Sequence, residues 1–422
     1  MKCITRFGAV SIGLTTALLL AGCAGGGAGG AEATPDTLEL WLPTAFASAS
    51  STDEKAVWTE ILTPFEQEHG VTVNLTLIPW ASYEEKYLTG ISSGEGPAVG
   101  YMYTEMMGDY VANDALISFD DSLSDAAAEK MLYLPQGQIQ GEQYAMPLVI
   151  GGMRVLWANT DLLAAAGISD LPQTWDDLLE DSQLLLDAGV TPMLQEWGAP
   201  DRGMLNHTFF PLLWQAGGDI LTDDGSKTAF NSPEGIEAAE FLMTLLDKGY
   251  MPSSVSGLNG DEVKAAFLSG QTAFMFGSDG TIAELEGTGI NAEFVPSLIG
   301  KQEGTFVASD ALVMLQACPD KQLCTALVEH ILDGPQMTLF HESIVAYPPI
   351  ATDEKADATS AFAAAYEEKS DILRSLPIAA GGAAVYNSLY QNLQQMILGQ
   401  KSPADALQDA ATAGDAALTS AR

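Results

Sequence analysis

Strand-like runs alternate with amphipathic helices along most of this 422-residue chain, and this alternation limits the fold more than any other feature. Near the start, Leu38 to Leu42 and Val71 to Leu77 have the apolar and β-branched pattern of strands. Residues 53–69, which lie between them, have the pattern of a helix. This order of strand, helix and strand predicts an α/β fold, with helices packed on a sheet.

Three later helices carry clear start signals. Thr174 opens a capping box, in which a side-chain oxygen accepts a backbone N–H of the first turn. Ser232 is followed by Pro233, and Ser402 by Pro403, so each pair places serine at the N-cap and proline at the first helical position. These signals predict where the helices begin.

Two short runs between these helices are continuously apolar. Thr272 to Phe276 lies between glycines, and Val307 to Leu315 has the same character. Such runs are typical of strands buried on both faces of a parallel sheet. The chain is long enough for two cores, and it has neither an internal repeat nor a long linker. We therefore expect two lobes joined by several strand crossings.

The N-terminus has the three parts of a secretory signal. Lys2 and Arg6 form a basic region, residues 12–20 form an apolar stretch, and Leu20-Ala21-Gly22-Cys23 supplies a cleavage site with small residues. The apolar stretch is shorter than the roughly 20 residues that cross a bilayer. We therefore expect residues 1–22 to be removed as a signal peptide.

The cleavage site resembles the bacterial lipobox, in which a cysteine after small residues is lipidated and becomes the new N-terminus. The resemblance puts a lipid anchor on Cys23; the alternative is an ordinary signal peptide with an incidental cysteine. Residues 24–30 are nearly all glycine and alanine, so we expect residues 23–35 to form a flexible tether. The mature protein would then be held at the extracytoplasmic face of the cell membrane.

The chain is strongly acidic, with 17 basic and 56 acidic residues. This charge disfavours nucleic acid and anionic lipid surfaces as partners. The acids are spread along the chain instead of forming one tail, which favours a solvated surface over a cation-binding role. Asp223 and Asp224 with Asp219 would allow a calcium site, but Asp224-Gly225 is first of all a tight turn. No metal or other cofactor is expected.

Two cysteines remain once the signal and the proposed anchor are set aside. Cys318 and Cys324 are separated by five residues, and in a secreted chain this spacing allows a small disulfide between a strand end and the following helix. Two buried thiols are the alternative.

Several segments, in order and spacing, resemble the carbohydrate-binding extracellular solute-binding proteins of ABC importers, the maltose-binding-like group. The resemblance covers most of the chain. The segments are Tyr144 to Pro147, Val155 to Leu163, Ala166 to Ile168, Pro172 to Leu178, Gly217 to Asp219, Phe230 to Glu234, Gly270 to Met275 and Gly399 to Leu407.

The resemblance implies a two-lobe periplasmic-binding-protein-like fold with a ligand cleft between the lobes. Lobe 1 would comprise residues 36–146 and 295–345, and lobe 2 residues 147–294 and 346–422. The crossings between the lobes are then expected near the following prolines: Pro147, Pro296 and Pro348-Pro349.

A neutral sugar needs hydrogen-bonding groups beside flat aromatic surfaces, and the resemblance places both at this cleft. In lobe 1 it points to Trp41, Thr44 and Phe46 around the end of the first strand, and to Met102 and Glu105 in a second loop. Glu105 would accept two sugar hydroxyls. Core packing remains an equal alternative for Trp41, and methionines pack lobes more often than they line sites.

In lobe 2 the resemblance points to Gly152, Trp197, His207 and Tyr386. The family commonly has a tryptophan about where this chain has Gly280, so one stacking ring is missing and Asp279 would offer hydrogen bonds instead. This departure allows a ligand smaller or more polar than a maltodextrin.

The expected function is therefore capture of a sugar or oligosaccharide by hinge closure, for an ABC importer whose membrane permease is the partner. The protein is expected to be a monomer. It is not expected to be an enzyme, because no hydrolase elbow, zinc-protease motif or phosphate loop is present. Two alternatives remain. The acidity allows a binding protein for a cation such as a polyamine, and the many carboxylates allow a cell-surface glycoside hydrolase.

Overall fold

The computed structural model describes residues 37–44, 51–198, 202–345, 347–355 and 361–421. The predicted signal peptide, the tether with Cys23, and Phe46 lie outside the described residues.

The first sheet is built from the strands that the opening pattern predicts. Its order is β2-β1-β3-β13-β4, with β7 also paired to β13. Its central strands are almost wholly buried, which explains their continuous runs of apolar residues. The strands are β1 (Thr37–Pro43), β2 (Thr72–Ile78), β3 (Val99–Met102), β4 (Leu116–Ile117), β7 (Ala145–Gly151) and β13 (Ala308–Leu315). A small hairpin of β5 (Gln138–Ile139) and β6 (Glu142–Gln143) comes just before β7 in the sequence.

Strand direction in this sheet is mixed. β1 pairs in parallel with β2 and β3, whereas β13 is antiparallel to both β3 and β7. The prediction that Val307 to Leu315 lies in a parallel sheet is therefore wrong. The apolar run reports burial on both faces, and burial does not depend on the direction in which a strand enters the sheet.

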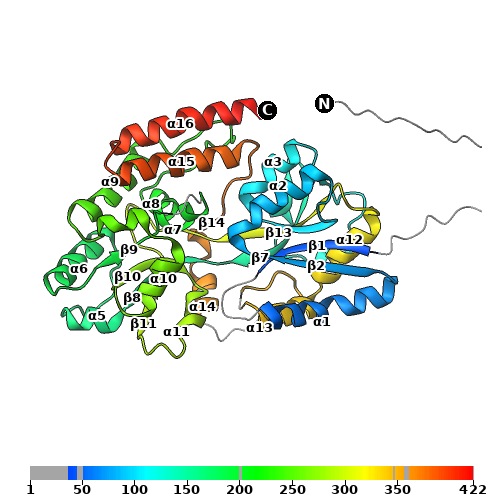
Figure 1. Cartoon of the computed structure of the whole chain (residues 1–422), viewed down its shortest axis with the longest axis horizontal. Helices are drawn as coiled ribbons and strands as arrows, with labels where there is room; N and C mark the ends of the chain where they lie inside the picture. The colour runs from blue at the N-terminus through cyan, green and yellow to red at the C-terminus, as the bar shows by residue number, and fades with distance from the viewer. Residues whose placement is uncertain (1–36, 45–50, 199–201, 346, 356–360, 422) are drawn as a thin grey trace, which may run out of the picture. The chain divides into compact units, whose positions relative to one another are not determined.

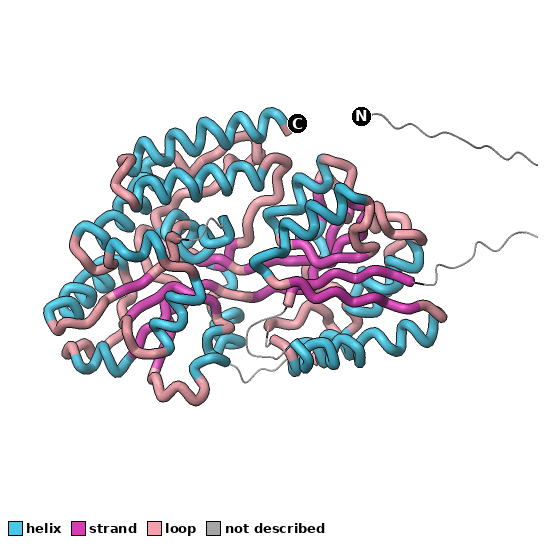
Figure 2. Tube along the Cα trace, viewed as in Figure 1, coloured by secondary structure: helices cyan, strands magenta, loops and turns pink. Residues whose placement is uncertain are grey.

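Helices cover both faces of the first sheet (Figures 1 and 2). On one face α1 packs with α12 and α13, where the rings of Trp58 and Phe340 are 5.3 Å apart. α2 and α3 lie on the other face. The helices of this lobe are α1 (Ser51–His69), α2 (Tyr83–Ser93), α3 (Thr104–Ala112), α4 (Asp125–Lys130), α12 (Lys321–Ile331) and α13 (Gly334–Ser343).

The second sheet has the order β11-β8-β10-β9. β10 is parallel to β9 but antiparallel to β8, so the expectation of a parallel sheet around Thr272 to Phe276 is also wrong in part. The strands are β8 (Arg154–Asn159), β9 (Met193–Leu194), β10 (Phe274–Ser278) and β11 (Ala292–Val295). The surrounding helices are α5 (Thr160–Ala165), α6 (Trp175–Asp187), α7 (Leu205–Thr208), α8 (Phe210–Gln215), α9 (Pro233–Asp247), α10 (Gly260–Leu268) and α11 (Thr281–Leu285).

The predicted helix starts are confirmed. Thr174 and Asp177 form the reciprocal capping box of α6, and Ser232 caps α9 with Pro233 in its first turn. Ser402 caps α16 by accepting the backbone N–H of Asp405.

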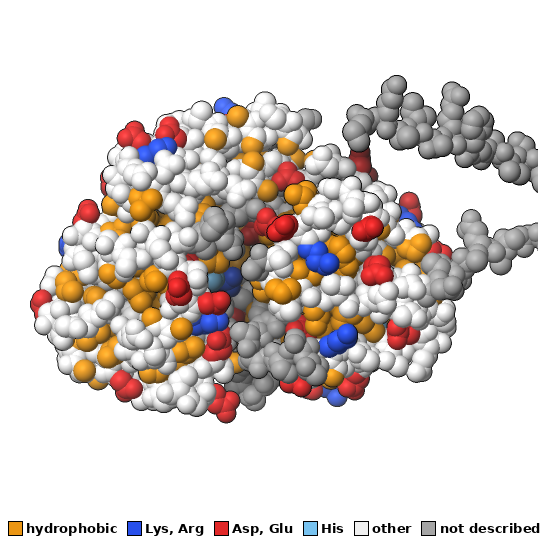
Figure 3. All heavy atoms as spheres, viewed as in Figure 1, with side chains coloured by type: hydrophobic (Ala, Val, Ile, Leu, Met, Phe, Trp, Pro, Cys, Tyr) orange, Lys and Arg blue, Asp and Glu red, His pale blue; other side chains and the backbone are white. Residues whose placement is uncertain are grey.

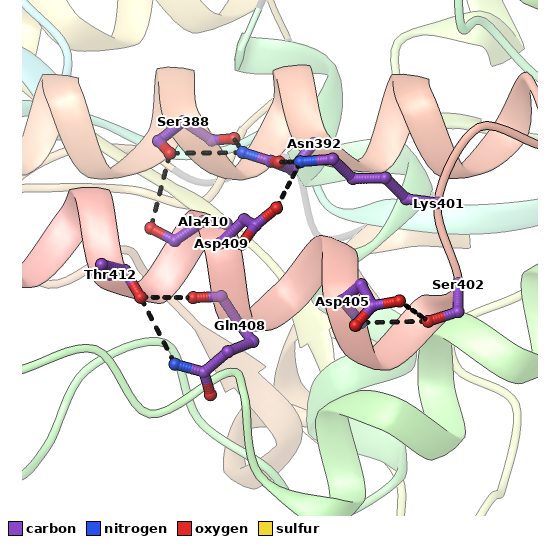
Figure 4. A network of polar contacts seen from close by, with 9 residues as sticks. All are labelled: Ser388, Asn392, Lys401, Ser402, Asp405, Gln408, Asp409, Ala410 and Thr412. Atoms are coloured by element: carbon purple, nitrogen blue, oxygen red, sulfur yellow. Dashed lines mark hydrogen bonds and ion pairs between the residues drawn. The ribbon is translucent and has the colours of Figure 1, made fainter.

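The last two helices, α15 (Gly382–Ile397) and α16 (Pro403–Ser420), run side by side as a hairpin (Figure 1). Lys401 fastens their connection by donating to Asn392 on α15 and pairing with Asp409 on α16, both at 2.6 Å (Figure 4). Because Lys401 and its partners are polar and partly exposed, their contacts orient the hairpin but add little stability. The buried apolar faces of α15 and α16 stabilise the hairpin.

Three segments connect the sheets. The first leaves β7 at Gly151 and enters β8 at Arg154; Pro147 still lies within β7, opposite Ala311. The second contains β12 (Thr305–Phe306), and the third contains α14 (Ala361–Glu368) and β14 (Leu373–Arg374), which pairs with β12. The first crossing therefore lies a few residues beyond the proline near which it was predicted.

Cys318 and Cys324 are joined by a disulfide, which ties the end of β13 to α12 as the sequence analysis expected. Closing so short a loop restricts the unfolded chain and should add about 2 kcal/mol to the free energy of unfolding. We expect Cys318→Ser/Cys324→Ser to lower that free energy by this amount in urea titrations. Reductant should lower the wild-type value equally and leave the double variant unchanged; equal stability of all samples would contradict this prediction.

No helix in the described part of the chain is both long enough and apolar enough to cross a membrane. Acidic side chains are scattered over the visible face instead of collected in one patch (Figure 3).

Candidate ligand site between the two lobes

One edge of the first sheet faces the second lobe, and strand direction identifies it. β1, β2 and β3 run the same way, and β7 runs with them because both β3 and β7 are antiparallel to β13. Since β7 leads directly into the second lobe, the carboxyl ends of all four strands lie at the edge where the lobes meet. This edge carries Thr44 after β1, Trp80 after β2, Tyr103 to Glu105 after β3, and Asp310 in the first half of β13.

The facing edge of the second sheet follows from the same reasoning. β8 enters that sheet at Arg154, opposite Ser278 at the end of antiparallel β10. β9 is parallel to β10, so the residues after both strands lie at this edge. They include Gln195 to Trp197 after β9, and Asp279 after β10. Ligand sites in α/β sheets are found at such carboxyl edges.

The two edges touch through a carboxylate and an amide. Asn206 of α7 lies with its Nδ2 3.4 Å from Oε1 of Glu105 on α3, and both side chains are buried. Oδ1 of Asn206 is buried without a hydrogen-bond partner among the described residues. Next to it, Nδ1 of His207 lies 2.6 Å from Oε1 of Glu196. A buried acceptor without a donor is costly, so this position suits a ligand hydroxyl.

A second buried carboxylate lies behind Glu105. Asp310 accepts a hydrogen bond from the Tyr101 hydroxyl and is buried. Burial, and then repulsion from the Glu105 carboxylate, raises the pKa of Asp310 to about 7; the Tyr101 hydrogen bond opposes this shift. Two carboxyl groups and one phenol thus form a polar centre beside the first and second crossings.

The third carboxylate, Asp279, accepts hydrogen bonds from the segment that enters lobe 2 and from the third crossing. Its Oδ2 accepts the Tyr366 hydroxyl at 2.6 Å and the backbone N–H of Met153 at 3.3 Å. Burial raises the pKa of Asp279, and the Tyr366 hydrogen bond and the charge of Arg154 act against this. Oδ1 of Asp279 and Nε of Arg154 are buried without partners among the described residues.

Several predicted ligand residues pack in lobe interiors. The Trp41 ring meets Tyr87 edge-on at 5.5 Å and fills the space above Gly90. Met102 is fully buried in β3. Trp197 stacks on Tyr390 at 5.7 Å, and the Tyr386 hydroxyl donates to the carbonyl of Pro377. These four side chains shape the lobes behind the facing edges, and the structure does not bring them to one surface.

Two further predictions concern backbone positions at the facing edges. Thr44 is half-buried, and its N–H donates to the carbonyl of Ile78. Gly152 has a φ of +65°, which favours glycine, and its carbonyl accepts a hydrogen bond from Arg154. A side chain here would approach the Arg154 guanidinium at 3.0 Å. Gly152 therefore allows the charged group to fold back over the crossing.

The site also contains residues that the sequence analysis did not select, including Asp310, Arg154 and Tyr366. A sequence signal existed for Asp310, because it is the one charge in the apolar run from Val307 to Leu315. A charge in such a strand must find partners or shift its pKa. The sequence gives no such signal for Tyr366. Its helix, α14, reaches the site only because the third crossing passes there.

A cavity of about 960 Å³ also adjoins the crossings and shares Tyr366 with the site. Its wall includes Tyr133 and His341 from lobe 1, Tyr347 in the third crossing, and Tyr366 with Glu367 from α14. None of the predicted ligand residues that the structure describes lines it. We assign the candidate site to the facing edges, because buried polar atoms of lobe 2 there have no partner in the described part of the chain and lobe 1 contributes Glu105.

The lobes also meet at a backbone contact, which we call the latch: Gly108 and Asp109 of α3 with residues 379–383. Oδ1 of Asp109 accepts the N–H of Gly381 at 2.5 Å, and Oδ2 accepts that of Ala383 at 3.3 Å. The carboxylate thereby lies at the N-terminus of α15, where negative charge is favourable. A Cβ at Gly108 would lie 2.3 Å from the carbonyl oxygen of Ala379, so only glycine allows this approach.

The raised pKa of Asp310 predicts a pH dependence of stability. The ordinary aspartate pKa is about 3.9, so between pH 4 and pH 7 the folded protein binds a proton that the unfolded chain releases. The protonated carboxyl of Asp310 contributes about 4 kcal/mol to the free energy of unfolding below pH 4. This contribution is lost as the pH rises through 7. We expect Asp310→Asn to flatten the pH dependence of the free energy of unfolding between pH 4 and pH 8.

Urea titrations at both pH values measure this effect, and Asp223→Asn, at an exposed loop position, is the control. The wild type and the control should lose stability together as the pH rises. A parallel loss in Asp310→Asn would show that the carboxyl of Asp310 is not the responsible group.

Two mixed α/β lobes with a polar site at their facing edges define a two-lobe architecture, and solved structures share this fold. The GacH receptor of Streptomyces glaucescens, solved unliganded and with acarbose, has a TM-score of 0.77 at 19% identity; the match covers 91% of this chain and 98% of that one. A solute-binding protein of Thermotoga lettingae with bound α-D-tagatose has a TM-score of 0.76 at 20% identity, with 91% and 100% covered.

The sequence itself gives the family. Residues 48–333 match the model of the bacterial extracellular solute-binding proteins, and the chain belongs to this family. A protein of Brucella abortus (strain 2308), named as a candidate binding protein, is 23% identical over 371 residues, which are 85% of this chain and 89% of the relative. The family is described as solute-binding proteins, and the two structural neighbours are a receptor and a solute-binding protein.

Proposed function

We propose that the protein is the extracytoplasmic substrate-binding component of an ABC importer, and that it holds a sugar or oligosaccharide between its lobes. The observation that carries this proposal is a set of buried polar atoms at the facing edges that have no partner within the described ranges: Oδ1 of Asn206, Oδ1 of Asp279 and Nε of Arg154. Each would gain a hydrogen bond from a hydroxylated ligand.

The mixture of donors and acceptors favours a neutral polyol. A sugar hydroxyl both donates and accepts, so it can bond both to the carboxylate and amide oxygens and to Nε of Arg154. Glu105 adds a charged acceptor, and hydrogen bonds to charged groups contribute about 1.5 to 3 kcal/mol each. The GacH receptor with acarbose and the Thermotoga lettingae protein with α-D-tagatose support a saccharide, since both have this fold.

Hinge closure is the proposed mechanism. Glu105 and Asn206 belong to different lobes, so a ligand can contact both only when the lobes are together. Binding then shifts the population toward the closed form by the difference in affinity between the two states. The membrane permease would recognise that form. We further propose that the protein acts as a monomer without cofactor, anchored through lipidated Cys23.

A thermal-shift screen against mono- and oligosaccharides, followed by calorimetry, tests this function. The best ligand at 100 times its Kd should stabilise the protein by about 2.7 kcal/mol. Its affinity should change little with salt, whereas a polyamine, the alternative that the acidity suggests, would bind with strong salt dependence. Recovery of the intact sugar after incubation separates a receptor from a glycoside hydrolase.

Closure itself is measured by small-angle scattering. We expect the radius of gyration to fall when the saturating sugar is added. Binding without any compaction would reject the hinge mechanism and leave the ligand assignment standing.

A further inference from the structure

Trp80 is an exposed aromatic residue at the edge of lobe 1 that faces lobe 2. β2 ends at Ile78, opposite Pro43 of β1, and Trp80 follows at once in a 3₁₀ turn, Trp80–Ser82. Its exposed fraction is 43%. The other large exposed hydrophobic side chains in the described part of the chain are leucines and isoleucines, so Trp80 is the one flat ring among them.

Neighbouring tyrosines hold the Trp80 ring in place. Its centroid lies 5.4 Å from that of Tyr83, 5.9 Å from Tyr101 and 6.2 Å from Tyr103. These partners are themselves fixed, because the Tyr83 hydroxyl bonds to the carbonyl of Tyr101, and that of Tyr103 to Glu84. A ring that is already immobilised loses little conformational freedom when a ligand stacks on it. The cluster therefore forms a rigid platform in which Trp80 remains 43% exposed.

The platform continues into the buried part of the site. Tyr103, which contacts Trp80, is the residue before α3, and Glu105 lies two positions further along. The same short loop thus carries an aromatic neighbour of Trp80 and the carboxylate that meets Asn206 of lobe 2. Trp80, Tyr103 and Glu105 thus lie along one stretch of the edge that faces lobe 2.

We propose that Trp80 is a stacking subsite for a second sugar unit, so that the preferred ligand is an oligosaccharide of at least two residues. This inference rests on the proposed function and specifies its substrate. The C–H face of a pyranose packs on an indole ring, while hydroxyls at the ring edge reach polar groups such as Glu84. In this way lobe 1 supplies a flat surface to the ligand.

The test compares sugars of different length on single variants. Calorimetry would measure Kd for the tightest trisaccharide from a panel of glucose, galactose and mannose oligomers, and for the monosaccharide that it contains. We expect Trp80→Ala to raise Kd for the trisaccharide at least tenfold and to leave Kd for the monosaccharide unchanged. Trp80→Phe should retain most of the trisaccharide affinity, since it keeps a flat ring.

Leu88→Ala is the matched control, because Leu88 is an exposed apolar residue on neighbouring α2 that should not affect either sugar. The inference is overturned if wild-type protein prefers the monosaccharide, or if Trp80→Ala leaves both affinities unchanged or weakens both equally. If wild-type protein binds no saccharide in the panel, the proposed function fails first. Thermal melts confirm that the variants are folded, and the exposure of Trp80 predicts that they are.

Discussion

Replacing Glu105 by alanine is expected to weaken sugar binding at least 100-fold. Glu105 is the charged acceptor at the contact between the lobes, and it is buried beside Asn206. Each hydrogen bond from a sugar hydroxyl to this carboxylate contributes about 1.5 to 3 kcal/mol, and one tenfold change in affinity corresponds to 1.4 kcal/mol. Two such bonds account for the expected loss.

The variant should also be more stable in the absence of sugar. Glu105 is a source of the repulsion that raises the pKa of Asp310, so removing its charge relieves an unfavourable buried pair. Loss of affinity together with unchanged or higher stability is a pattern that simple misfolding cannot produce. Calorimetry and urea titration measure the two effects on the same sample.

Glu85→Ala is the control for this experiment, because Glu85 is an exposed acid on α2. It should leave Kd within twofold of the wild type. If Glu105→Ala binds sugar as tightly as this control, Glu105 is not a ligand residue and the site must lie elsewhere between the lobes.

Helix starts could be predicted from the sequence because their signals are local. A serine or threonine with its partner three residues later is sufficient to satisfy a first turn, as Thr174, Ser232 and Ser402 show. Strand direction could not be predicted in the same way. β10 and β13 were found as buried strands, but whether each pairs in parallel depends on strands far away in the sequence.

The aromatic residues illustrate the limit for the site. A tryptophan near a strand end has the same sequence pattern whether its ring fills a core or stacks on a sugar. Trp41 lies inside β1 and turns toward α2, whereas Trp80 lies beyond the end of β2 and remains partly exposed. The difference of two residues past the strand end decides the outcome, and strand ends are the least certain part of a sequence-based prediction.

The polar centre was only partly accessible to sequence reasoning. Glu105 was found because its loop resembles a family motif, and Asp310 had a signal in its apolar surroundings. Asp279 was selected only as a substitute for a missing ring, and its partner Tyr366 lies 87 residues away. Contacts over such separations depend on the crossings, which composition and periodicity do not describe.

The second large effect is expected at the latch, where Gly108→Ala should weaken sugar binding at least tenfold. The new methyl group would lie 2.3 Å from the carbonyl oxygen of Ala379, so α3 and the segment before α15 could not keep their present approach. The Asp109 hydrogen bonds to Gly381 and Ala383 would lengthen with it. Because these contacts join the lobes, their loss favours the open form, and a ligand must then supply more free energy to close it.

The stability of each lobe should be spared by this change. Alanine favours a helix over glycine by roughly 0.5 to 1 kcal/mol, so α3 itself is not weakened. Gly260→Ala in α10 is the control, since the nearest atoms there are 3.9 and 4.0 Å away and the added methyl group fits. Scattering should show that Gly108→Ala without sugar is at least as extended as the wild type, and that compaction requires more sugar. If Gly108→Ala matches Gly260→Ala in both Kd and compaction, the contact between α3 and residues 379–383 has no part in closure.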